Sequence, residues 1–177
     1  KLENIEYGAF SWCNKISNIE LPESLISIGN SAFSYCTNLK TIIIPEGIEK
    51  LSDKMYEKCS NLETVQLPNN LITIGENVFK ECTKLNNIQL SNTLQCIESN
   101  AFENCTKLIK LQLPESMIEL KNNVFYNCTS LRAIIAPETI TKIGENVFYN
   151  CINLKIYTYK NTYIENYAHL NDIKVVI

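Results

Sequence analysis

Histidine is nearly absent from this chain, and glycine, methionine and tryptophan are scarce. The 177 residues include one histidine, five glycines, two methionines and one tryptophan. A lone histidine, His169, excludes a meaningful Ser-His-Asp constellation, and it cannot provide the imidazole ligands of most zinc sites. The glycines are scattered singly, which excludes a glycine-rich loop that cradles phosphate. The sequence therefore gives no support to an enzyme or to a bound cofactor.

Runs of basic or apolar residues are missing as well. The formal net charge is −3, and lysine and arginine form no cluster. Nucleic-acid binding and membrane-surface binding both leave a basic footprint, so we expect no nucleic-acid partner. No apolar stretch approaches the roughly 20 residues that span a bilayer, so we expect no membrane insertion.

The sequence does contain a repeat, and cysteine marks it. Seven of the eight cysteines follow one another at intervals of 23 residues without a slip: Cys13, Cys36, Cys59, Cys82, Cys105, Cys128 and Cys151. A fixed period of this size predicts a solenoid, in which each coil buries its apolar side chains only against the neighbouring coils. The one cysteine outside this phase is Cys96.

Other apolar positions recur in the same phase and predict the local structure of each coil. An aromatic residue precedes each cysteine by three positions, and aliphatic residues follow at three, six and eight positions; the last coil places Tyr157 and Tyr159 in the last two rows. The alternation in Ile19-Glu20-Leu21 is typical of a strand, which a proline ends in five coils. The spacing in Ala-Phe-x-x-Cys favours one or two helical turns, started by residues such as Asp53 and Asn122.

These rows, L-x-x-I-x-L-P-x-x-L-x-x-I-G-x-x-A-F-x-x-C, resemble the BspA-like class of leucine-rich repeats along nearly the whole chain. The resemblance implies a right-handed solenoid with parallel strands on its concave face and short helical turns on the convex side. It also implies a non-catalytic binding or adhesive role, often at a microbial cell surface. The usual asparagine ladder after the strand is replaced here mostly by small hydroxyl residues, which we expect to supply the ladder's hydrogen bonds. That row is Ser24, Gly47, Asn70, Thr93, Ser116 and Thr139.

The two ends of the chain differ. Residues 1–154 form about seven coils, the first of them truncated, and residues 155–177 break the pattern. Thr162 and Glu165 make a capping box, which predicts a helix from about Tyr163 to Leu170 and then a strand from Ile173 to Ile177. This tail resembles the C-terminal cap of the same family, with Tyr163, Ile164, Tyr167 and Leu170 covering the last coil.

The N-terminal end opens in the middle of a repeat, without a signal peptide or a polar cap. We expect the chain to be part of a longer protein, so an export signal or anchor could lie outside these residues. An uncapped coil exposes apolar surface, so we also expect end-to-end self-association through the N-terminal coil.

The cysteines and the acidic residues each suggest a site, and each has a plainer explanation. Eight cysteines could form disulfides, but parallel Cβ vectors in stacked coils favour a ladder of buried free thiols. A straight ladder cannot converge on a metal. Cys96 is more exposed and is the better candidate for a reactive thiol. The acidic pairs in neighbouring coils favour a solvated rim over an acid/base pair; they are Glu23 with Glu46 and Glu115 with Glu138.

The outward-facing strand positions are the candidate binding residues. They lie five and seven positions after each cysteine, and in the central coils they are nearly uncharged, with stacked amides and exposed aliphatic side chains. Such a surface suits a protein or glycan partner, although β-propensity alone would also explain it. The candidates are Thr41, Ile43, Thr64, Gln66, Asn87, Gln89, Lys110, Gln112, Ala133 and Ile135.

Two hypotheses for function follow. The first is a non-enzymatic binding or adhesion module of a microbial surface or secreted protein that holds a protein or glycan on its concave face. The second is an intracellular scaffold for protein–protein interaction, which eight unpaired cysteines in a reducing compartment would suit.

The thiol ladder makes a direct prediction. Titration of the denatured protein with a thiol reagent, without prior reduction, should find eight free cysteines, because no pair has the geometry of a disulfide. A count of four or fewer would contradict the ladder.

Overall fold

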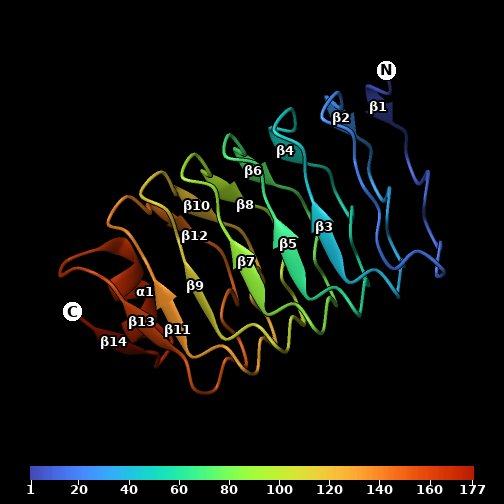
Figure 1. Cartoon of the computed structure of the whole chain (residues 1–177). Coiled ribbons are helices and arrows are strands. Elements are labelled where there is room, and N and C mark those ends of the chain that lie inside the picture. Colours follow the sequence, from blue (N-terminus) through green and yellow to red (C-terminus); the bar gives the residue numbers. More distant parts are fainter.

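The computed structural model describes all residues 1–177 as one stack of coils, each turning once around a shared core (Figure 1). The longer strands form one wall of the stack, and each pairs in parallel with its equivalent in the next coil. Two sheets make up this wall, β3-β5-β7 and β9-β11-β13-β14. The strands are β3 (Thr41–Ile43), β5 (Thr64–Gln66), β7 (Asn87–Gln89), β9 (Lys110–Gln112), β11 (Ala133–Ile135), β13 (Lys155–Tyr157) and β14 (Lys174–Val176).

A second wall consists of two-residue strands, which confirms the second short extended piece in each repeat. Their parallel pairing keeps an offset of 23 residues, as in Thr73 with Cys96. One end of this wall is the pair β1-β2, and the rest is the sheet β4-β6-β8-β10-β12. The strands are β1 (Asn4–Ile5), β2 (Ser27–Ile28), β4 (Lys50–Leu51), β6 (Thr73–Ile74), β8 (Cys96–Ile97), β10 (Glu119–Leu120) and β12 (Lys142–Ile143).

The third wall, formed by the Ala-Phe-x-x-Cys segments, contains turns, and the predicted helical turns are absent. Two residues per coil take a left-handed backbone, such as Asn100 (φ 59°) and Asn104 (φ 61°). Alternate N–H groups point to the next coil, so that the Phe102 N–H donates to the Val124 carbonyl at 2.9 Å. Asparagine tolerates this conformation better than most residues, and its recurrence at these positions was the signal in the sequence.

The residues predicted to start those helices have another role. The Asp53 Oδ1 accepts a hydrogen bond from the Glu76 N–H, and the Asn122 Oδ1 accepts one from the Glu145 N–H, both at 2.9 Å. Each side chain therefore caps a backbone donor of the following coil.

The hydroxyl row after the strands behaves as expected. The Ser116 Oγ donates to the Leu94 carbonyl at 2.7 Å, and the Thr139 Oγ1 donates to the Met117 carbonyl at 2.8 Å. Each bond joins a coil to the preceding one, so small hydroxyls do replace the asparagine ladder at these positions.

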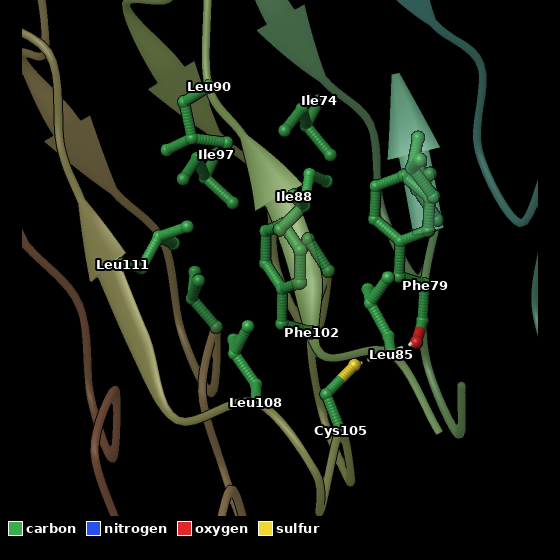
Figure 2. Close-up of a cluster of buried hydrophobic side chains, with 14 of the residues drawn as sticks. Ile74, Phe79, Leu85, Ile88, Leu90, Ile97, Phe102, Cys105, Leu108 and Leu111 are labelled. Carbon is green, nitrogen blue, oxygen red and sulfur yellow. Dashed lines mark hydrogen bonds between the residues drawn. The ribbon is translucent and has the colours of Figure 1, made fainter. Parts of the chain in front are cut away.

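The core is one continuous cluster of 49 buried apolar residues. Seven aromatic rings stack through it, with neighbouring centroids 5.1–5.8 Å apart, from Phe10 to Phe148. Figure 2 shows two of these rings, Phe79 and Phe102, among the aliphatic side chains of adjacent coils. At about 1.5–3 kcal/mol per buried aliphatic or aromatic side chain, these rows dominate the stability of the fold.

All eight cysteines are free, and the ladder is built as predicted. Each thiol after the first donates to a carbonyl of the preceding coil, as Cys105 does to Phe79 at 3.2 Å (Figure 2). The equivalent bonds of the other five span 3.1–3.2 Å. The thiols thus fill space as small apolar groups and also satisfy a backbone acceptor.

The last coil departs from the 23-residue spacing, which corrects two positions predicted to face inward. In β13, Ile156 pairs with Ile134, an offset of 22 residues. Ile156 is therefore buried, whereas Tyr157 and Tyr159 are exposed. The alternation of Leu154, Ile156 and Thr158, all buried, explains the shift, because this order puts an apolar side chain inside at every second position.

The C-terminal cap follows the prediction closely. Helix α1 spans Tyr163–Leu170, and its Glu165 N–H donates to the Thr162 Oγ1. Ile164 is buried as expected, but Tyr163 and Leu170 are exposed and leave the covering of the coil to Ala168 and the half-buried Tyr167. The final strand, β14, adds to the long-strand wall beside β13. The boundary at residues 154/155 remains a prediction, which the change of offset at β13 supports.

Tyr56 is the one hydroxyl in the aromatic stack, and its Oη is buried without a hydrogen-bond partner. Replacing Tyr56 by Phe should raise the free energy of unfolding by about 1–2 kcal/mol, because an unsatisfied buried polar group is removed. Urea denaturation measures this change. Tyr126→Phe, on a half-buried ring of the third wall, is the control and should change stability by less than about 0.5 kcal/mol. Equal effects of the two substitutions would contradict the prediction.

Burial raises the pKa of the ladder thiols, to about 11 at Cys36 and about 12 at Cys151, and well above the ordinary value at Cys82 and Cys105. Above a pH of about 8.5 the unfolded chain loses thiol protons that the folded chain keeps. Stability should therefore be complete below that pH and fall as the pH rises, by up to about 1.4 kcal/mol per pH unit for each fully buried thiol. Denaturation curves between pH 8 and 10 measure the slope.

The double variant Cys82→Ser/Cys105→Ser is the control for this experiment, because serine does not titrate in this range. Its slope should be shallower than that of the parent protein. An unchanged slope, or a stability that is flat over the same range, would show that the thiols do not cause the effect.

Candidate functional site

The outward surface of the long strands β3, β5, β7, β9, β11, β13 and β14 is the candidate functional site, and we call it the strand face (Figure 1). In each of the strands from β3 to β11, the middle residue is buried and its two neighbours point outward. Alternation in these strands therefore places all ten predicted binding residues on this face. Seven are exposed and three, Thr64, Ala133 and Ile135, are half-buried.

Strand pairing brings those residues into rows along the axis of the stack. Thr41, Thr64 and Asn87 occupy equivalent places on β3, β5 and β7, and so do Ile43, Gln66 and Gln89. Farther along, Lys110 pairs with Ala133 and Gln112 pairs with Ile135. Neighbours in a row lie about 4.8 Å apart at Cα, so a ligand on this face meets residues of several coils at once.

Two polar hollows lie over the middle of the face. One, of about 400 Å³, is lined by Gln66, Gln89 and the loops that follow β5 and β7. The other, of about 290 Å³, lies between Gln89, Lys110 and Gln112. Amide groups can both donate and accept hydrogen bonds, so these hollows suit ligands with exposed polar groups of either kind.

The rim beside these hollows contains Glu46, one of the paired acidic residues. Its carboxylate accepts hydrogen bonds from the backbone N–H and the Nδ2 of Asn69, at 2.8 and 3.0 Å. Glu46 thus holds the loop after β5 in place, which agrees with a structural rim rather than an acid/base pair.

The C-terminal end of the face differs in character. A hollow of about 580 Å³ is lined by Lys110, Ala133, Ile135 and Tyr157. Tyr157 was missed as a surface residue because the repeat spacing places it inside. The alternation that starts at Leu154 was the signal that could have found it.

Other candidate chemistry does not assemble. Burial and the neighbouring Glu98 raise the pKa of the Cys96 thiol to about 12, so it stays protonated at neutral pH, contrary to its expected reactivity. No group of three or more His, Cys, Asp or Glu residues is placed to hold a metal ion. No helix has the length and apolar character needed to cross a membrane.

Solved structures of bacterial proteins share this architecture. A T. pallidum leucine-rich repeat protein is 26% identical, with a TM-score of 0.83 over 99% of this chain and 79% of that one. A leucine-rich repeat protein from Bacteroides ovatus is 32% identical, with a TM-score of 0.70 over 89% of this chain and 47% of that one, so this chain spans about half its length. The pneumococcal vaccine antigen PcpA, 20% identical with a TM-score of 0.56 over all of this chain and 60% of its own, shares the fold.

No curated protein matches the chain. The model of the BspA type leucine rich repeat region does match, in six copies over residues 1–82 and 50–175. With the coil architecture and the thiol and aromatic rows described above, this match over nearly the whole chain shows that the protein belongs to the BspA-type leucine-rich repeat family.

Proposed function

We propose that the chain is a non-enzymatic interaction module that binds a protein or glycan on its strand face. The observation that carries the proposal is an exposed aliphatic side chain among amides, Ile43, which is 60% exposed beside Gln66. Exposed apolar groups ringed by polar ones are typical of interaction sites. Family membership adds support, because leucine-rich repeat proteins are generally interaction modules without enzymatic activity.

We further propose that this module acts in adhesion, as part of a microbial surface or secreted protein. The relatives that support this are bacterial, and one is described as a vaccine antigen. The second hypothesis, an intracellular scaffold, is supported by the eight free cysteines, which a reducing compartment keeps unpaired. Fractionation of the source cells separates the two, because an adhesin must be found at the surface or in the medium.

Self-association through the N-terminal coil is a further part of the proposal. Phe10, Cys13 and Ile16 are only partly buried, whereas their equivalents in the next coil are fully buried. The end of the stack therefore presents apolar core residues to a second copy. Sedimentation at rising concentration tests this, and a strictly monomeric particle would contradict it.

Binding through the strand face is tested by two matched substitutions in one coil. Thr64 lies on β5 and Thr73 on β6, both are half-buried, and they face away from the core on different walls. Candidate ligands come from proteins and glycans retained by the immobilised chain. Thr64→Arg should weaken their binding at least about tenfold, as steric and charge clashes at a contact surface do, whereas Thr73→Arg should not. Equal binding by both variants would contradict the proposal.

A further inference from the structure

Three lysines share one row at the C-terminal end of the strand face. The parallel register places Lys110 beside Ala133, Ala133 beside Lys155, and Lys155 beside Lys174 on β14. All three lysines are exposed. The ion pairs of the molecule involve Lys58, Lys80, Lys121 and His169, so none of these three has an acidic partner. The cationic row is thus available to a ligand.

This arrangement is unfavourable for the isolated fold. Lys155 and Lys174 stand directly opposite on adjacent strands, about 4.8 Å apart at Cα, and like charges in that position repel. The neighbouring row, Gln112, Ile135, Tyr157 and Val176, contains no carboxylate to offset them. The chain as a whole is acidic, with a net charge of −3, so this concentration of positive charge is local.

An apolar hollow accompanies the lysines. Its volume is about 580 Å³, and Ala133, the smallest side chain of the face, forms its floor between Lys110 and Tyr157. Tyr157 is 38% exposed although its ring could pack. A small residue between larger neighbours leaves room for one inserted side chain, and aliphatic and aromatic walls favour an apolar one.

We propose that this end of the strand face binds an acidic peptide segment that carries an apolar anchor residue. The carboxylates of the segment lie along Lys110, Lys155 and Lys174, and the anchor side chain fills the hollow over Ala133 between Ile135 and Tyr157. A sulfated glycan would satisfy the lysines but would leave the apolar walls without an apolar partner, so the observations favour a peptide. This inference rests on the proposed function and specifies the partner's chemistry.

The direct test uses synthetic peptides and the full chain. A fluorescein-labelled octapeptide of alternating Asp and Leu should raise its anisotropy on binding, and the affinity should fall as salt increases. Two matched peptides, alternating Asp with Ser and alternating Lys with Leu, should each bind at least about tenfold more weakly, since each removes one of the two features. If the Asp-Ser peptide or a heparin octasaccharide binds as tightly as the Asp-Leu peptide, the site recognises anions only and the proposal is wrong.

Variants of the protein locate the binding. Lys174→Glu should weaken binding of the Asp-Leu peptide at least about tenfold while it raises Tm, because Glu and Lys155 then attract across the strands. Lys142→Glu makes the same charge change on β12, in the second wall, and should leave the affinity unchanged. Tyr157→Thr should weaken the Asp-Leu peptide but not the Asp-Ser peptide. Equal losses with Lys142→Glu and Lys174→Glu would overturn the proposed site.

The outcome is separable from that of the proposed function. If the Asp-Leu peptide does not bind while a natural ligand remains sensitive to Thr64→Arg, this inference fails and the strand face remains the binding surface. If the peptide binds as described and Thr64→Arg has no effect on any ligand, only the C-terminal end of the face is supported.

Discussion

Parallel pairing between successive coils is the constraint on which the rest of this structure depends. Each coil donates and accepts backbone hydrogen bonds on all three walls, through two kinds of strand and through the left-handed turns of the third wall. Because the pairing offset is constant along the repeats, every side chain lies beside its equivalents. The composition of one repeat position therefore determines a whole row of the molecule.

Inside the stack, this constraint turns single residues into continuous columns. The thiols and the aromatic rings succeed because each is apolar enough to be surrounded by copies of itself and small or flat enough to stack at the coil spacing. A polar atom in such a column has few potential partners, since its neighbours are apolar as well. Tyr56 illustrates the consequence, because its hydroxyl finds no acceptor in a column of phenylalanines.

Outside the stack, the same register groups side chains that folding does not require. The middle of the strand face becomes a field of amides, and its C-terminal end becomes a row of lysines beside an apolar hollow. Neither grouping stabilises the core, and the pair Lys155 and Lys174 opposes folding by charge repulsion. Features of this kind are explained most simply by what they contact outside the chain, which is why the strand face is the proposed site of function.

The amino-acid sequence by itself determined the repeat, the two strand positions, the buried rows, the free thiols and the capped helix α1, because period and capping chemistry are local properties. It also placed ten outward residues such as Gln89 correctly on one face. Only the tertiary structure decided the turns of the third wall, where carbonyls of the next coil hold residues such as Asn104 left-handed. It alone decided the register at β13 and β14, which turned Tyr157 outward and set Lys155 beside Lys174. Pairing between strands so placed is a property of packing, and no repeat period specifies it.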